Sequence, residues 1–411
     1  MNERKTAWEK HQPGSTDHLQ IFNVAFEYPV CFTRNVFDPA NDCLARTIDR
    51  LDEGRLHRCC VFVDAGLAAA QDDLPARIQQ YFHAHRKTLE LAVPPQSVPG
   101  GKRAKTDWQA VRNVLTTIGN AHLDRQSFVL AVGGGSCLDM LGFAASIVHR
   151  GLRLVRIPST TLGQNDAGIG VKNGMDEHGQ KNFIGTFAPP FAVINDASLP
   201  TSCDQETWIA GVAEAIKVAM IKDAAFFEMI SQLAGAMRMR DSQAMQQVVR
   251  RCAELHLEHI RTGGDPFEFG SARPLDFGHW AAHKLEMLSG YQLGHGQAVA
   301  LGICVDSYCA MRSSLLGEAE FLSVLETIAA AGLPTWDDLL GRRKREGKLE
   351  ILGGLDDFRE HLGGTLTITL PDGIGGKTEV HHLNAADVED AVEYLQYRHR
   401  KDTETPDADR P

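Results

Sequence analysis

Residues 127–136 read SFVLAVGGGS and run directly into CLDMLGFAASIV at 137–148. After Ser127 the first stretch is apolar, as in a buried strand, and the segment beyond the glycines has the apolar spacing of a helix. A glycine turn between a strand and a helix presents backbone N–H groups that can hold a pyrophosphate. The stretch therefore predicts one strand–helix unit of a parallel sheet and a candidate dinucleotide site. A tight turn without a ligand would have the same sequence.

Strand-like and helix-like segments alternate around this unit. We expect strands at 59–64, 89–93, 127–132 and 152–157, and helices at 74–83, 108–118 and 137–148. This alternation is typical of a Rossmann-like α/β domain, in which helices cover both faces of a parallel sheet.

The pattern of apolar residues changes after residue 200. Apolar residues at three- and four-residue spacing predict helices at 206–222, 225–239, 242–261, 276–288 and 295–315, and a hairpin is expected around Pro371-Asp372-Gly373. We therefore expect an α/β domain at 19–200 and a mainly helical domain at 201–400. Residues 1–18 and the charged tail at 401–411 are expected to be disordered.

Composition excludes several classes of function. The chain has 411 residues and a net charge of −11, which argues against nucleic acid as a partner but not against a small phosphorylated substrate. No apolar run approaches the ~20 residues of a membrane helix. The nine cysteines form no CxxC pair, so we expect free thiols and a reducing, cytoplasmic location.

A second informative stretch is PSTTLGQNDAGIGVKNGMDEHGQKN at 158–182. It contains Asp166, Lys172, Lys181 and Asn182, and a phosphate monoester needs a lysine and neutral donors of this kind. A solvated loop has a similar composition, so the residue types alone leave both interpretations open.

The helical half carries a candidate metal set. In AGVAEAIK at 210–217, Glu214 and Lys217 lie three residues apart on one face of an apolar helix. Histidines follow in RPLDFGHWAAHKLE at 273–286 and GHGQAV at 294–299. A lone histidine is usually a core or surface residue, but one carboxylate with His279 and His295 suits zinc or cobalt with open coordination positions.

Together these motifs resemble those of the sugar phosphate cyclases, which include 3-dehydroquinate synthase and 2-epi-5-epi-valiolone synthase. The glycine turn alone is also similar to that of metal-dependent alcohol dehydrogenases. The resemblance implies a zinc or cobalt ion held by Glu214, His279 and His295. It implies NAD contacts for Asp64, Lys105, Gly134, Gly135, Ser136, Asp139, Thr160, Thr161, Asp166 and Lys181. It implies substrate contacts for Lys172, Asn182, Lys217, Arg273, Asp276, His283 and, across a homodimer interface, Arg150.

The implied reaction closes a seven-carbon sugar phosphate into a carbocycle. It runs through transient oxidation by NAD, phosphate elimination, reduction and an intramolecular aldol step. Asp276 replaces the asparagine of 3-dehydroquinate synthases, and FREHLGG at 358–364 resembles sedoheptulose 7-phosphate cyclases, whereas His283 is as in 3-dehydroquinate synthase. This mixture suggests a separate branch, such as the cyclase-like proteins of the ebo cluster.

Other interpretations stay open at the level of sequence. Lys102 replaces a glutamate that faces the adenosine ribose in the family. A lysine would better tolerate the 2′-phosphate of NADP, so the choice between NAD and NADP stays open, although NAD is expected. A metal-dependent polyol dehydrogenase would explain the glycine turn and the metal set but not the phosphate-binding residues. A non-catalytic scaffold derived from a cyclase would have no need of all three metal ligands.

Overall fold

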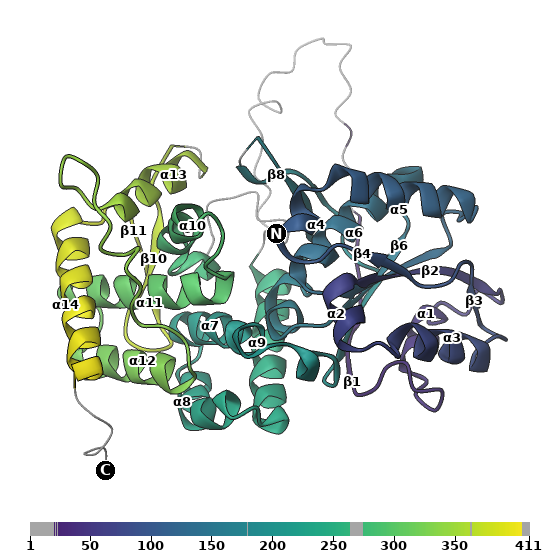
Figure 1. Ribbon diagram of the computed structural model, residues 1–411, viewed down its shortest axis with the longest axis horizontal. Coiled ribbons are helices and arrows are strands. Elements are labelled where there is room, and N and C mark those ends of the chain that lie inside the picture. The colour runs from purple at the N-terminus through teal and green to yellow at the C-terminus, as the bar shows by residue number, and fades with distance from the viewer. Residues whose placement is uncertain are drawn as a thin grey trace, which may run out of the picture.

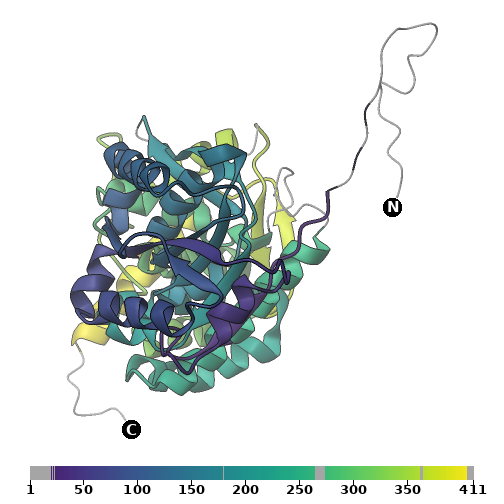
Figure 2. The same cartoon turned by 90° about the vertical axis from the view of Figure 1, so that its right-hand side faces the viewer.

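The computed structural model describes residues 20, 22, 24–178, 180–263, 274–361 and 364–404. An α/β domain and a helical domain lie side by side along the long axis of the molecule (Figure 1). In the view turned by 90°, the α/β domain stands in front of the helical domain (Figure 2). The segment expected to be disordered at 1–18 lies outside the described residues, as does 405–411. Residues 401–404 belong to the last helix, so the helix enters the predicted tail.

The first domain is built on a seven-stranded parallel sheet in the order β1-β9-β6-β5-β2-β3, with β4 also pairing with β2. The strands are β1 (Val30–Thr33), β2 (His57–Asp64), β3 (Leu89–Leu91), β4 (Gln96–Val98), β5 (Phe128–Gly133), β6 (Arg153–Pro158) and β9 (Ala192–Asp196). Every residue of β5 is buried, as expected for a strand covered on both faces. The predicted parallel α/β sheet is therefore confirmed.

Two layers of helices cover this sheet. The helices are α1 (Cys43–Ile48), α2 (Ala65–Ala70), α3 (Leu74–Ala84), α4 (Gly101–Thr106), α5 (Trp108–Asn120) and α6 (Gly135–Ile147). Apolar residues of α1 and α3 pack on one face, and those of α4, α5 and α6 pack on the other. The glycine turn joins β5 to α6, at the carboxyl edge of the sheet.

A hairpin that the sequence did not reveal lies between β6 and β9. Its strands, β7 (Lys172–Glu177) and β8 (Gln180–Phe187), pair in antiparallel fashion and pack against α6. The hairpin contains most of the second half of the 158–182 stretch, so the predicted phosphate-binding residues lie on strands rather than on a loop.

The second domain consists mainly of helices. They are α7 (Gln205–Lys222), α8 (Ala224–Arg238), α9 (Ser242–Thr262), α10 (His279–Leu288), α11 (His295–Arg312), α12 (Glu318–Ala330), α13 (Gly353–His361) and α14 (Ala385–Glu404), with the small antiparallel pair β10 (Ile368–Pro371) and β11 (Lys377–Val380). Helices α7 and α11 are buried along most of their length, which is typical of central helices with apolar residues on all sides. In the part of the chain that the structure describes, no helix combines the length and apolarity needed to span a bilayer.

Candidate metal and cofactor site

Helix α7 places two opposite charges inside the helical core. Glu214 is 0% exposed and Lys217 is 3% exposed, and the two side chains form an ion pair one helical turn apart. Burial alone would raise the pKa of the Glu214 carboxyl, but Lys217 and two imidazoles outweigh burial and hold that pKa well below its ordinary value. Burial would lower the pKa of Lys217, but Glu214 and Asp166 raise it to about 12. Both groups are therefore charged at neutral pH.

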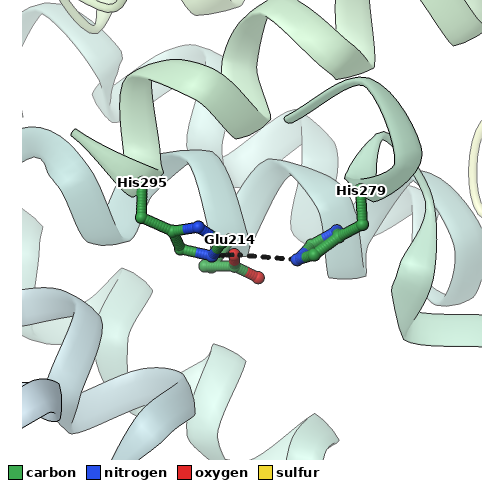
Figure 3. Close-up of side chains that lie close together, drawn as sticks. All are labelled: Glu214, His279 and His295. Atoms are coloured by element: carbon green, nitrogen blue, oxygen red, sulfur yellow. Dashed lines mark ion pairs between the residues drawn. The ribbon is translucent and has the colours of Figure 1, made fainter. Parts of the chain in front are cut away.

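Two histidines face this carboxylate from the first residues of two helices. His279 begins α10 and His295 begins α11, and the three side chains point toward one another (Figure 3). The Oε1 atom of Glu214 lies 3.6 Å from Nε2 of His279 and 3.3 Å from Nε2 of His295. One candidate ligand atom from each residue lies within 4.8 Å of the others.

This cluster fits a zinc or cobalt ion. The Glu214 carboxylate oxygens are buried, and apart from the ion pair with Lys217 they have no hydrogen bond among the described residues, although a buried carboxylate with so few partners is costly. Nδ1 of His279 donates to the carbonyl oxygen of Phe277 at 3.1 Å, which leaves Nε2 as the lone-pair nitrogen on the Glu214 side. Burial and Lys217 lower the pKa of His279 well below its ordinary value, so this imidazole is neutral, as a metal ligand must be.

The relative position of α10 and α11 depends on Asp306, a fully buried residue of α11. Its carboxylate accepts hydrogen bonds from the Gly278 N–H at 2.9 Å and the Trp280 indole N–H at 2.7 Å. These two donors flank His279 in the chain. Asp306 therefore fixes the start of α10 against the helix that carries His295.

Other predicted substrate groups lie around this cluster. The His283 ring lies 5.4 Å from that of His279 and 6.2 Å from that of His295. Asp276 precedes α10 in a short 3₁₀ turn and contributes to the raised pKa of Lys217, so it lies in the same electrostatic environment. The prediction for Arg273 lies outside the described residues.

Sequence reasoning overlooked Glu286, although it ends a motif that we quoted. This residue of α10 is 5% exposed. Both its oxygens accept from Lys181 of β8 at 2.8 Å, and Oε1 lies 3.4 Å from Nδ1 of His295. Lys181, a predicted cofactor residue, thus reaches the helical domain. The H-x-x-E spacing from His283 places the two residues on one helical face, and this was the signal available in the sequence.

The glycine turn is closely packed. A Cβ atom at Gly135 would lie 2.9 Å from Cβ of Ala167, and one at Gly134 would lie 3.3 Å from Cγ2 of Thr160. Among the described residues, no side chain caps the N-terminus of α6, which includes Ser136. Its first N–H groups are therefore available to an anion.

Asp64 lies beside this turn at the end of β2. Its carboxylate accepts from the Gly66 N–H at 2.8 Å, and a Cβ atom at Gly133 would lie 2.9 Å from Cβ of Asp64. Gly100 packs on the same carboxylate, because a Cβ there would lie 2.3 Å from Oδ2 of Asp64. The predicted cofactor residue and the turn are thus neighbours at one edge of the sheet.

Lys105, Asp139 and Asn182 form one polar cluster. The Lys105 ammonium donates to Oδ2 of Asp139 at 2.6 Å, to the Gly174 carbonyl at 2.9 Å and to Oδ1 of Asn182 at 2.5 Å. Three acceptors satisfy the three N–H groups of an ammonium. The predicted phosphate-binding residue Asn182 therefore lies with two predicted cofactor residues, where the hairpin meets α4 and α6.

Two further predicted cofactor residues lie where the domains meet. The Thr161 hydroxyl donates to the Trp208 carbonyl at 3.0 Å and accepts from the Gly211 N–H at 3.1 Å, so it anchors α7. Asp166 lies in a short π-helical turn, with Oδ1 at 3.4 Å from Nδ1 of His256 on α9. Sequence analysis gave no sign of His256, because nothing in its helix distinguishes it from a core residue.

Lys172 and Arg150 are predicted substrate residues whose side chains are exposed. Lys172 is exposed at the start of β7, and its carbonyl accepts from the buried guanidinium of Arg156 at 3.0 Å. Sequence reasoning missed Arg156, a charge inside an apolar strand. Arg150 is exposed beyond the carboxyl end of α6. The 13 residues of that helix separate it from the glycine turn by about 20 Å.

The fold and site define a two-domain protein with a candidate dinucleotide turn in one domain and a candidate metal set in the other. Residues 96–210 match the family model for the 3-dehydroquinate synthase N-terminal domain, and residues 211–348 match the model for the C-terminal domain.

Individual relatives agree with these matches. The chain is 32% identical over 317 residues to 3-dehydroquinate synthase of Sulfurovum sp. (strain NBC37-1), which covers 75% of this chain and 83% of the relative. It is 31% identical over 358 residues to 2-epi-5-epi-valiolone synthase of Streptomyces glaucescens, with 87% of each chain covered. A solved structure of ValA, the 2-epi-5-epi-valiolone synthase of Streptomyces hygroscopicus subsp. jinggangensis 5008, with NAD⁺ and Zn²⁺ bound, superposes with a TM-score of 0.80. It is 27% identical and covers 93% of this chain and 99% of that chain.

This chain belongs to the sugar phosphate cyclase superfamily of 3-dehydroquinate synthase-like proteins. The predicted superfamily is therefore confirmed. Identities of 32% and 31% to relatives of two different activities do not assign the branch.

Proposed function

We propose that this chain is an NAD- and metal-dependent cyclase that converts a seven-carbon sugar phosphate into a carbocycle with loss of phosphate. The observation that carries the proposal is the convergence of Glu214, His279 and His295 in one cluster, in which Glu214 and His279 are buried. Relatives about 30% identical to this chain are named for reactions of this class.

In the proposed reaction, bound NAD and a metal ion would supply part of the chemistry, and side chains of the protein supply the rest. Bound NAD would supply a reversible hydride acceptor, and a zinc or cobalt ion on the three ligands would supply a Lewis acid. Lys217 keeps Glu214 ionised and donates hydrogen bonds to substrate hydroxyls, since its pKa of about 12 keeps it protonated. His283, stacked near His295, donates to the substrate from the same side. Glu214 and Lys217 are 0% and 3% exposed, and exclusion of water strengthens the electrostatic contacts that these two groups make.

Lys172 and Asn182 bind the phosphate end of the substrate in this proposal. Arg156 supports that role because it fixes the backbone beneath Lys172, donating to the Gly170 carbonyl at 2.6 Å and to Oδ1 of Asn173 at 2.6 Å. A lysine on a fixed strand loses less entropy on binding phosphate than one on a free loop. Arg273 is proposed to contribute a further cation.

A homodimer is part of the proposal. Arg150 lies beyond α6, about 20 Å from the glycine turn, and is proposed to serve the site of a second copy. Support comes from the exposed apolar side chains of Ile147, Phe183 and Phe187, which are 45%, 53% and 45% exposed. They belong to the end of α6 and to β8, which are joined by the Ser146–Thr186 hydrogen bond. An apolar patch beside an exposed strand favours association with another chain.

The cofactor is proposed to be NAD rather than NADP. Lys102 is the residue that left this choice open. Its ammonium lies 4.2 Å above the Tyr291 ring and donates to the Gly290 carbonyl at 3.5 Å. These contacts direct Lys102 toward the helical domain instead of a 2′-phosphate. All nine cysteines are free thiols, in keeping with the reducing cytoplasm that we propose as the location.

Sedoheptulose 7-phosphate is the proposed substrate. A substrate carboxylate would be repelled by Asp276, which lies in the electrostatic environment of Lys217, whereas a sugar hydroxyl can donate to it. The test is phosphate release from sedoheptulose 7-phosphate and from a carboxylated heptulosonate phosphate, with zinc or cobalt and catalytic NAD. We expect release from the first substrate and no net NADH. Release from the second alone would contradict the substrate assignment, and release from neither would contradict the cyclase proposal.

The same assay tests a polyol dehydrogenase. That enzyme would accumulate NADH from glycerol-type alcohols and release no phosphate. A scaffold without catalysis would show neither signal, but it would have no reason to keep three candidate ligands within 4.8 Å of one another.

A further inference from the structure

Glu286 connects the two halves of the candidate site. Its carboxylate is buried on α10, and groups from different domains contact it. Lys181 of the hairpin donates to both oxygens at 2.8 Å, and Nδ1 of His295 lies 3.4 Å from Oε1. Glu286 is therefore ion-paired with a lysine of the other domain and lies behind a candidate metal ligand.

The His295 ring has a carboxylate on each side. Nε2 faces Glu214 at 3.3 Å and Nδ1 faces Glu286 at 3.4 Å. Nδ1 is buried and makes no hydrogen bond among the described residues. An imidazole that binds a metal through Nε2 carries its proton on Nδ1, and that N–H needs an acceptor. Oε1 of Glu286 is positioned to accept it after a small rotation of the ring.

The other candidate ligand, His279, shows the same arrangement with a different acceptor. Its Nδ1 donates to the Phe277 carbonyl at 3.1 Å. Each histidine thus has an acceptor behind the nitrogen that faces away from Glu214. For His279 this acceptor is neutral backbone, whereas for His295 it is an anion.

We propose that Glu286 is a positioning residue for the metal ion. Its carboxylate orients His295 with Nε2 toward the ion and increases the basicity of that nitrogen. Lys181 holds both carboxylate oxygens and thereby restricts rotation of the Glu286 side chain. This inference rests on the proposed metal site and adds to it a residue that does not itself contact the ion.

The test is the affinity of metal-free protein for cobalt(II), measured by competition with a chelator and by the visible absorption of bound cobalt. We expect Glu286→Gln to weaken binding about 10-fold, because the amide is an uncharged acceptor. Glu286→Ala, which removes the acceptor, should weaken it toward about 100-fold. The absorption band should shift in both variants as the His295 ring reorients.

Asp357→Asn is the matched control. Asp357 accepts from Lys284, also on α10, at 2.8 Å, but it contacts no candidate ligand. We expect cobalt affinity and spectrum to match those of the wild-type protein. Far-UV circular dichroism and urea unfolding identify any loss of fold. If the alanine variant does not fold, the nearly isosteric glutamine variant decides.

The outcomes are distinguishable. Wild-type affinity and spectrum in Glu286→Gln and Glu286→Ala would overturn the inference while leaving the metal site intact. A lower urea midpoint with unchanged cobalt binding would also overturn it, because that result describes a residue that only ties the domains together. Failure of the wild-type protein to bind cobalt would contradict the proposed function as well.

Discussion

At the scale of single residues, two buried charges in the helical core are better explained by function than by stability. Glu214 and Lys217 are buried as charges among apolar neighbours. Replacing such a pair by apolar residues is often neutral or stabilising, whereas removing one partner costs about 3–5 kcal/mol. A pair of this kind is thus poorly explained as a contribution to stability, and the proposed metal site offers a reason for it.

Glu214→Gln should abolish metal binding. The amide is a weak ligand, and the uncompensated Lys217 charge remains in the core. We expect bound zinc, measured by elemental analysis after gel filtration, to fall from one equivalent to less than about a tenth, and the urea midpoint to fall as well. Glu228→Gln on α8, an exposed glutamate, is the control. Full zinc content in the Glu214 variant would show that another set of residues binds the ion.

Asp306 gives a prediction about pH. Burial raises the pKa of its carboxyl from 3.8 to about 7, against the effect of its two N–H donors. The folded state therefore binds this proton more tightly than the unfolded state. The resulting stability is complete below about pH 4 and is lost as the pH rises through 7. In metal-free protein, the urea unfolding free energy of the wild type should fall relative to Asp306→Asn between about pH 5 and pH 8. A rise would contradict this assignment.

At this scale the sequence predicted residues that stand in distinctive motifs. Glu214, His279 and His295 were expected to form one set, and the structure brings them together. Glu286 and Arg156 were missed because their importance comes from burial and from partners far along the chain. Burial of a charge is decided by tertiary packing, and the local pattern around either residue does not report it.

At the scale of elements, the site depends on the contact between α10 and α11. Gly278 has φ +77°, in the region that favours glycine. Gly302 of α11 lies against it, since a Cβ at Gly302 would be 2.0 Å from the Gly278 carbonyl oxygen. Close approach of these backbones brings the two histidines to one point.

Gly302→Ala should therefore separate the two helices. We expect a loss of several kcal/mol in unfolding free energy, because the obstacle is backbone that cannot move aside, together with weaker cobalt binding. Gly235→Ala on α8 is the control, since a Cβ there meets nothing within 4 Å. That change should stabilise the protein by about 0.5–1 kcal/mol. Equal stability of the two variants would contradict the packing argument.

The elements themselves were predicted well where periodicity is strong. The buried parallel strands and the helices from 206 to 315 follow from runs of apolar residues or from their helical spacing. Helix α10 begins at His279 rather than at the predicted residue 276, because Gly278 leaves helical geometry. The hairpin of β7 and β8 was missed because β8 is largely exposed and its sequence carries little apolar alternation.

At the scale of the whole molecule, a complete site in our proposal needs two chains. Arg150→Ala and Lys217→Met should each inactivate the enzyme when assayed alone. When the two variants are refolded together, one of the two sites in each heterodimer has an intact Lys217 from one chain and an intact Arg150 from the other. Because about half of the dimers are heterodimers, activity should return to about a quarter of the wild-type value. Absence of recovery, with heterodimers present, would contradict a role for Arg150 across the interface.

The placement of the two domains relative to each other was the part of the structure least accessible from sequence. Both domains and the family could be predicted from motifs, but contacts such as Lys102 with Tyr291 and Lys181 with Glu286 join residues more than 100 positions apart. Such pairs depend on how the two domains are placed, which no local pattern in one chain determines.

The most direct test of the account is an anomalous difference map from crystals of the protein grown with zinc. We predict one strong peak, at about 2.0–2.2 Å from a Glu214 oxygen and from Nε2 of both His279 and His295. A peak at other residues, or none near these three in a crystal that contains stoichiometric zinc, would contradict it.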